Sequence, residues 1–297
     1  MPNSQAIFPS VQTVQELCPI STVTTGSLRS RTDSIKLTWC GILVSYGVSS
    51  ASSGLGLKHD DPKIKIIIEK IFENISTEGP FQLPMNIPVH FGGTGQNQYA
   101  WALCDAPIIV YSLAKFGLIK DERIIKAKDF LIGLCRNNGY PCTVSKELGK
   151  FRGPGKKDDP CPYATLIMLK LMNLNNTDRI SDNAKISIDS LLNLWKQSMS
   201  LHPYMFYMGT DFRKLKVPLI WYDILHFADT LSNFQYAIND QRFKEIVNLI
   251  EQKADDNGFY TPESEWRAWK GWDFGQKKQP SAWLTFLVYR IKKRMNK

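Results

Sequence analysis

Asp223 and His226 are the first pair of residues whose types and spacing could do chemistry. They lie three positions apart inside an apolar stretch, residues 219–234. A helix would place them on one face, where a carboxylate can orient an imidazole for proton transfer. Burial also raises the pKa of a carboxyl, which suits a general acid. Asp105 and Asp229 likewise interrupt apolar stretches, and Asp105 joins the pair as a catalytic candidate. The alternative is that these residues cap neighbouring loops or satisfy buried backbone groups.

A second set of candidates lies mainly in the loops that come before the apolar stretches. The loops are residues 90–101, 149–162, 211–218 and 267–280. The first is rich in glycine, and the other three supply the Lys and Arg residues. Glycine lets a ligand approach the backbone and helix N-termini add partial positive charge, so the loops suit an anionic group with a hydrophobic tail. The alternative is that they are ordinary solvated loops whose cations pair with neighbouring acids. The candidate ligand-binding residues are Arg152, Lys156, Lys157, Arg213, Lys214, Trp221, Arg267, Trp272, Asp273, Gln276 and Lys277.

Three cysteines, Cys135, Cys142 and Cys161, could converge on a metal ion together with Cys104. Zinc accepts four such thiolates, but the sequence lacks the paired C-x-x-C spacing of zinc sites. Buried thiols that act as small apolar side chains are the alternative. Because the chain shows no export signal, we expect reduced thiols rather than disulfides. The sequence identifies no cofactor.

The C-terminal part of the chain combines aromatic rings with positive charge. Trp266, Trp269 and Trp272 recur every three residues and could stabilise a cation or simply pack under a loop. Residues 266–297 contain nine Lys or Arg and one Asp, a formal charge of +8 in a chain whose net charge is +9. The final run, residues 290–294, is typical of a solvated helix C-terminus. Zinc-finger, RNP and basic-zipper patterns are absent, so nucleic acid is not favoured as a partner.

The elements that must position these residues are predicted to be helices arranged in pairs. Four nearly all-apolar stretches, residues 106–116, 163–174, 219–234 and 282–291, recur with a period of about 60 residues, which fits two helices and their loops. Helices that are hydrophobic all round belong in a core. The four stretches therefore predict inner helices.

More amphipathic segments follow the first three stretches and predict outer helices. They cover residues 123–135 after Asp121, residues 183–195 after Ser181 and residues 241–254 after Asn239, each with a helix-start signal. An earlier pair is predicted at residues 36–46 and 63–75, where Asp61-Pro62 supplies an N-cap and a first-turn proline.

Three of the outer helices are followed by a turn of one type: Glu78-Gly79-Pro80-Phe81, Asn138-Gly139-Tyr140-Pro141 and Asn257-Gly258-Phe259-Tyr260. Glycine past a helix end is the expected left-handed cap, and the aromatic residue can pack back on the helices. This alternation of inner and outer helices resembles the α/α toroid of terpenoid cyclases and protein prenyltransferases, and the turns are similar to degenerate squalene-cyclase repeats. Uncharacterised prokaryotic prenyltransferase-like and squalene-cyclase-like proteins have the same character.

The resemblance covers residues 36–297. It implies an all-α fold, an α/α toroid of about five helical hairpins in one domain at residues 35–297, with residues 1–34 as an N-terminal arm. It also implies an isoprenoid-handling protein that binds an anionic amphipathic ligand, such as a prenyl diphosphate, in the barrel. A non-catalytic lipid binder, a toroidal protein-interaction scaffold and a carbohydrate-active barrel stay open as alternatives.

The catalytic motifs of those families are not intact in this chain, so the resemblance does not decide whether it is an enzyme. Asp158-Asp159-Pro160 lacks the third carboxylate of the cyclase Asp-x-Asp-Asp motif, and no Asp-Asp-x-x-Asp motif is present. Cys104-Asp105 has the wrong order and spacing for the zinc site of protein prenyltransferases.

The pattern of hydropathy sets the expected location. No stretch approaches the ~18–20 consecutive apolar residues of a membrane span, and the first residues lack the basic and apolar run of a secretory signal. A cytoplasmic protein is therefore expected, and a transient contact with a membrane surface stays open.

Overall fold

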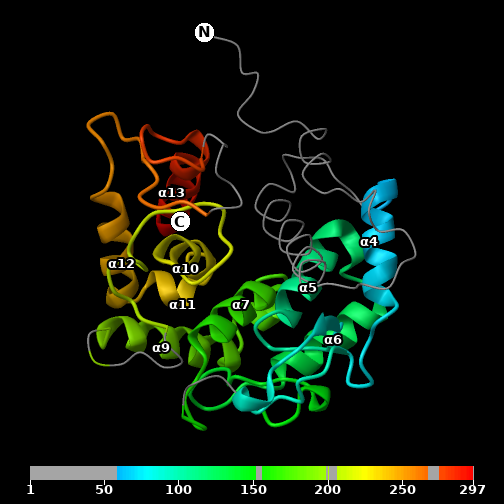
Figure 1. Ribbon diagram of the computed structural model, residues 1–297. Helices are drawn as coiled ribbons and strands as arrows, with labels where there is room; N and C mark the ends of the chain where they lie inside the picture. Colours follow the sequence, from blue (N-terminus) through cyan, green and yellow to red (C-terminus); the bar gives the residue numbers. More distant parts are fainter. Residues whose placement is uncertain (1–58, 152–155, 199, 201–205, 267–273, 297) are drawn as a thin grey trace. The chain divides into compact units, whose positions relative to one another are not determined.

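The structure is a computed structural model that describes residues 59–151, 156–198, 200, 206–266 and 274–296. Within these ranges the regular structure is mainly α-helical, with one pair of short strands (Figure 1). The expectation of an all-α fold is confirmed at this level. The chain divides into two compact units, residues 1–133 with 142–152 and residues 134–141 with 153–297. Closure of the helices into a toroid stays a prediction, and the predicted arm at residues 1–34 lies outside the described residues.

The first unit combines helices with a small hairpin that the sequence did not predict. Its two strands pair antiparallel, with Leu83 opposite Ala100 and Met85 opposite Gln98. The predicted loop at residues 90–101 therefore ends as a strand. The elements are α4 (Pro62–Phe72), β1 (Leu83–Met85), η3 (Val89–Phe91), β2 (Gln98–Ala100), α5 (Ala106–Leu113), η4 (Ala114–Leu118), α6 (Glu122–Ile132) and η5 (Lys146–Leu148).

The second unit is built around helix α10, which contacts α7, α12 and α13 (Figure 1). Helix α9 packs against α7 and α12. The elements are α7 (Pro162–Met172), α8 (Asn176–Arg179), α9 (Asp182–Lys196), α10 (Ile224–Leu231), α11 (Gln235–Ile238), α12 (Gln241–Glu251) and α13 (Ala282–Met295).

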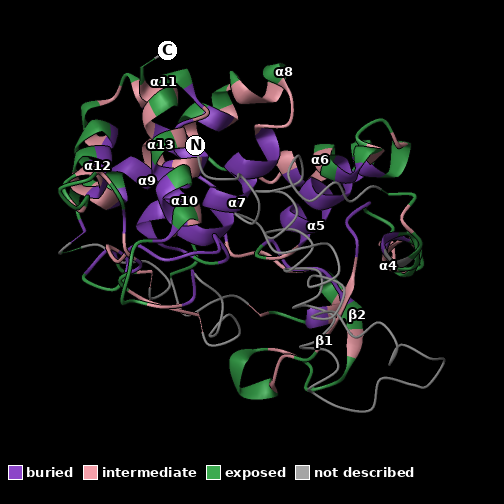
Figure 2. Cartoon of the chain, turned by 90° about the horizontal axis from the view of Figure 1, so that it is seen from above, coloured by how far each residue is buried: buried purple, intermediate pink, exposed green. Residues whose placement is uncertain are grey.

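The predicted division into inner and outer helices is visible in the burial of side chains, except at α13. This helix was predicted as an inner one but buries a single face and leaves Phe286 and Tyr289 exposed. Every residue of α5 and of α7 is buried, whereas α9 and α12 bury one face only, as the mixed colours of α12 show (Figure 2). The outer helices start at the predicted caps: Asp121 accepts a hydrogen bond from the backbone N–H of Arg123, and Ser181 accepts one from that of Ala184. The cap of α12 is Asp240 rather than Asn239.

Helix α10 is shorter than the apolar stretch that predicted it. The stretch covers residues 219–234, but the helix runs only from Ile224 to Leu231. Asp223 has an extended backbone (φ −144°, ψ 165°) and caps the helix, so the preceding residues are not helical. Leu219, Ile220 and Tyr222 are nevertheless buried. An apolar run of this kind predicts that its residues are buried, but it does not predict whether they are helical.

Two of the glycine-aromatic turns join the inner helices through the same hydrogen bonds. The backbone N–H of Tyr140 donates to Oγ1 of Thr165 (3.1 Å), and that of Tyr260 donates to Oγ1 of Thr285 (3.0 Å). The carbonyls of the same tyrosines accept hydrogen bonds from the residues that cap α7 and α13, Cys161 (2.7 Å) and Ser281 (3.0 Å). All three pairs of positions are 120 residues apart, which is twice the period predicted from the sequence.

The glycines of these turns have the expected left-handed backbone, with φ 112° at Gly139 and 80° at Gly258. Tyr140 and Tyr260, which follow them, are fully or almost fully buried. The left-handed glycine and the aromatic ring packed back against the helices are thus confirmed for both turns. The predicted role of these glycines as helix caps is wrong, because α6 is capped by Gly133 and α12 by Gln252, both in right-handed conformation, and each turn comes several residues later.

The predicted helix at residues 36–46 lies outside the described residues. None of the described helices is both long and apolar enough to cross a membrane.

Candidate functional site

The candidate site lies in the second unit, at the N-terminus of α10. Asp223 is fully buried there, and its Oδ1 accepts hydrogen bonds from the backbone N–H groups of Leu225 (3.1 Å) and His226 (3.0 Å). Aspartate is one of the preferred N-cap residues because its carboxylate can accept these otherwise unpaired N–H groups. The local sequence thus places a carboxyl group at the head of a core helix.

The other carboxyl oxygen of Asp223 makes this group unusual. Oδ2 is buried and has no hydrogen-bond partner among the described residues. Burial raises the pKa of Asp223 to about 7, and the two backbone hydrogen bonds and the positive charge of Lys216 offset only part of that effect. A carboxyl in this state is protonated in mildly acidic solution and can donate a proton near neutral pH.

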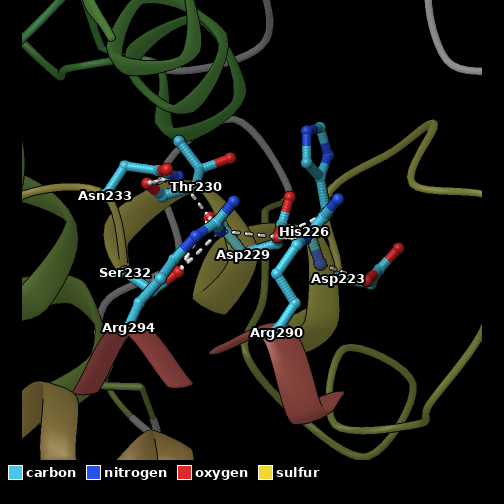
Figure 3. A network of polar contacts seen from close by, with 8 residues as sticks. All are labelled: Asp223, His226, Asp229, Thr230, Ser232, Asn233, Arg290 and Arg294. Carbon is cyan, nitrogen blue, oxygen red and sulfur yellow. Dashed lines mark hydrogen bonds and ion pairs between the residues drawn. The ribbon is translucent and has the colours of Figure 1, made fainter. Parts of the chain in front are cut away.

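His226 is held by a different partner from the one predicted. Its Nδ1 lies 2.7 Å from the carbonyl oxygen of Trp221, so the ring donates Nδ1–H to that carbonyl. Burial, assisted by the positive charge of Lys170, lowers the pKa of His226 to about 3, so the imidazole is neutral. Figure 3 shows the ring and the carboxylate of Asp223 diverging. The predicted orientation of the imidazole by Asp223 is wrong, because Asp223 caps the helix; a catalytic role for either residue stays a prediction.

The far end of α10 carries a second aspartate, Asp229, in a contrasting environment. Arg290 of α13 donates to its Oδ1 from Nη2 (2.6 Å) and Nε (3.1 Å), and Arg294 donates from Nη1 (2.9 Å) (Figure 3). Arg294 also donates to the carbonyl of Asp229 and to Oγ of Ser232. Although burial acts to raise the pKa of Asp229, the two arginines outweigh it and lower the pKa. The predicted solvated run at residues 290–294 therefore sends two side chains inward.

Aromatic rings gather beside the N-terminus of α10. The ring of Trp221 lies 4.3 Å from that of Tyr163 and 5.8 Å from that of Phe206. The ring of Tyr222 lies 5.2 Å from that of Phe206 and 5.0 Å from that of Phe212. We call these five residues the aromatic cluster. Trp221 is half exposed, at 47%, whereas Tyr163, Phe212 and Tyr222 are buried.

Three cations of the segment 211–216 lie next to this cluster. The guanidinium of Arg213 stands 4.9 Å over the ring of Trp195, which in turn contacts Phe212. Lys216 is buried; its Nζ lies 3.2 Å from Oδ2 of Asp211 and 4.8 Å over the ring of Trp266.

Lys214 belongs to the same group of cations, because its Nζ lies 3.6 Å from Oδ1 of Asp211. Burial acts to raise the pKa of Asp211, but Lys216 and Lys214 outweigh it and lower the pKa. Arg213, Lys214 and Trp221, all predicted as ligand-binding residues, are thus brought into one region.

The other predicted ligand-binding residues are not brought into this group by any described contact. Lys156, Lys157 and Lys277 are exposed. The loop around Lys157 is tied down by its backbone, because Arg136 donates to the carbonyl of Lys157. The side chain of Gln276 serves its own loop, accepting from the backbone N–H groups of the residues that follow and donating to one of their carbonyls. Arg152, Arg267, Trp272 and Asp273 lie outside the described residues.

Asp105 belongs to the first unit and the other catalytic candidates to the second. It lies at the N-cap position of α5 without capping it, and its Oδ2 accepts a hydrogen bond from the thiol of Cys104 (3.4 Å). Burial raises the pKa of Asp105, and the thiol offsets part of the rise. Its predicted catalytic role is untested.

The cysteines that the sequence left open as metal ligands form no metal site among the described residues. Cys142 belongs to the first unit, whereas Cys135 and Cys161 belong to the second. In the parts of the chain that the structure describes, no group of three or more His, Cys, Asp or Glu side chains could hold a metal ion.

Two buried lysines are part of the site. Lys216 is one of the cations of the predicted basic loop at residues 211–218, whereas Lys170 was not a candidate from the sequence. The charge of Lys216 acts on Asp223, and that of Lys170 of α7 acts on His226 and Asp229. A signal for Lys170 was present in the sequence, because a lone cation interrupts an otherwise apolar inner helix. A charge at such a position needs compensation in the fold.

Comparison with known proteins does not extend this assignment: no protein-family model matches the chain, and no curated protein matches it.

Proposed function

We propose that the second unit binds an anionic amphipathic ligand of the prenyl diphosphate type. One observation carries the proposal: the segment 206–222 brings three cations together with the aromatic cluster. Arg213 and Lys216 each stand over a tryptophan ring, and Lys214 shares Asp211 with Lys216. Cations and aromatic faces in one region provide for both parts of such a ligand.

Exposure and charge indicate which residues would bind each part of the ligand. Trp221 is the half-exposed ring of the cluster and rests on Tyr163, so it offers an apolar face to a hydrocarbon chain. Arg213 and the two lysines provide N–H donors for a phosphate group. A rigid aromatic surface also binds a flexible chain with little loss of side-chain entropy.

A binding function is favoured over catalysis by the arrangement of the polar residues on α10. Asp223 uses one oxygen to cap the helix, and His226 uses Nδ1 to hold the carbonyl of Trp221, so the two do not form an acid–base pair. Asp223 is the one group of the site with the pKa of a general acid, about 7. We therefore propose a lipid-binding protein in which Asp223 is the group to test for acid catalysis.

The test is calorimetric titration of the full chain with farnesyl diphosphate, with farnesol as the uncharged comparison. We expect farnesyl diphosphate to bind more tightly than farnesol, and Trp221→Ala to weaken both by about tenfold, equivalent to ~1.4 kcal/mol, through loss of the ring contact. The matched control is Phe286→Ala on α13, which removes a ring of similar exposure at 50%. Equal losses in the two variants, or no binding of farnesyl diphosphate, would sink the proposal.

A further inference from the structure

A single carboxylate holds two of the cations of the proposed site. Oδ2 of Asp211 lies 3.2 Å from Nζ of Lys216, and Oδ1 lies 3.6 Å from Nζ of Lys214. The two oxygens of one side chain are therefore divided between two ammonium groups. A phosphate group presents the same feature, with more oxygens and more negative charge.

The burial of the partners is unequal. The side chain of Lys216 is 5% exposed, whereas that of Asp211 is 76% exposed. A buried ammonium needs a compensating anion. Asp211 supplies that anion from the solvent side, where its carboxylate keeps much of its hydration and is screened by salt. Asp211 is thus positioned to compensate Lys216 in the absence of a ligand and is held weakly enough to leave.

The surroundings would accept a stronger anion than one carboxylate. The segment 211–216 contains three cations and one acid. Nζ of Lys216 lies over the ring of Trp266, and Arg213 lies over that of Trp195, which contacts Phe212 of the aromatic cluster. An anion at this position would therefore have an apolar surface within reach for an attached hydrocarbon chain.

We propose that Lys214 and Lys216 form the subsite for a phosphate or diphosphate group and that Asp211 is its displaceable internal occupant. Binding of the ligand would exchange the carboxylate for phosphate oxygens, and Asp211 would turn into solvent. The inference rests on the proposed function, because the aromatic cluster supplies the rest of the site. It adds that in the free protein Asp211 competes with the ligand for Lys214 and Lys216.

The inference predicts a gain of affinity when Asp211 is neutralised. Inorganic pyrophosphate and farnesyl diphosphate are titrated separately into the wild-type chain, Asp211→Asn, Lys216→Met and a control, Asp182→Asn. The control removes an exposed aspartate that pairs with Lys185 at 3.0 Å on α9. We expect Asp211→Asn to bind both probes about threefold more tightly, an effect that shrinks in 1 M salt, because the ligand no longer has to displace the carboxylate from the two lysines. Lys216→Met should weaken both by about tenfold, and the control should change neither.

Circular dichroism establishes that each variant is folded, and Asp211→Ser provides a second test with the same expected gain. Unchanged or weaker binding by Asp211→Asn and Asp211→Ser, with farnesyl diphosphate still bound through Trp221, would overturn the inference and leave the proposed function standing. If neither probe binds the wild-type chain or any variant, both are overturned. Binding of farnesyl diphosphate but not of pyrophosphate by Asp211→Asn would also overturn the inference, because the anion would then not be recognised by itself.

Discussion

The two ends of α10 carry the same residue type in opposite states. Asp223 and Asp229 lie six residues apart, and burial acts to raise the pKa of both. At Asp223 one oxygen is left without a described partner and the pKa rises to about 7. At Asp229 two arginines reach in from α13 and the pKa falls. The difference teaches that the supply of partners, more than removal from water, decides whether a core carboxyl is charged.

The strongest way to test this comparison is the pH dependence of Asp223→Asn. A carboxyl with a folded pKa of about 7 and an unfolded value near ~3.9 binds more protons in the folded state. The stability that it contributes is present at low pH and is lost as pH rises through the folded pKa. Between pH 5 and pH 8 the wild-type chain should therefore lose about 3 kcal/mol that Asp223→Asn does not lose. Urea unfolding at the two pH values measures this difference.

Asparagine is itself a good N-cap, so the helix start is conserved in this variant. Asp182→Asn, which changes an exposed aspartate, is the control and should follow the wild-type chain. Parallel loss of stability in the wild-type chain and in Asp223→Asn would show that Asp223 is charged in the folded protein.

The same substitution at the other end of α10 should have the opposite sign. Asp229→Asn removes the counter-charge of Arg290 and Arg294, and we expect a loss of about 2 kcal/mol at pH 7, because the two guanidinium groups are only partly exposed. Since the folded pKa of Asp229 is lowered, its contribution is present above the unfolded pKa and is lost as pH falls through the folded pKa. The loss measured by urea unfolding should accordingly shrink in acid. A neutral or stabilising effect at pH 7 would contradict the comparison.

The smallest effect is expected at His226, between the two aspartates. Asparagine can place a donor where Nδ1 of histidine lies, whereas glutamine places it where Nε2 lies. His226→Asn should therefore be about 1 kcal/mol more stable than His226→Gln, because only the former retains the hydrogen bond to the carbonyl of Trp221. Thermal unfolding of the two variants measures the difference. Equal stabilities would show that the hydrogen bond from Nδ1 to the carbonyl of Trp221 does not stabilise the fold.

Much of the helical framework could be predicted from local sequence. Apolar runs and cap residues located α7, α9 and α13 closely, since those signals act within a few residues. The start of α10 could not be obtained in this way, because Leu219 and Tyr222 are buried without being helical.

The contacts of the site were harder to predict because they join distant parts of the chain. Asp229 meets Arg290 across 61 residues, and no local pattern marks that pairing. The spacing of Asp223 and His226 suggested a pair, but the helix begins between them, and the cap geometry turns the carboxylate toward the backbone. Sequence spacing predicts that two residues share a face only when both lie inside the helix.

The hydrogen bonds that attach a turn to an inner helix recur at Thr165 and at Thr285, and we call each set a joint. These joints affect how such a chain can become longer or shorter during evolution. Each joint uses main-chain atoms and one threonine hydroxyl, and the two joints share no residue. A helical hairpin bounded by such joints contains the residues that attach it to its neighbours. Gain or loss of a whole hairpin would thus leave the neighbouring connections chemically unchanged, making the hairpin the natural unit of growth for this architecture.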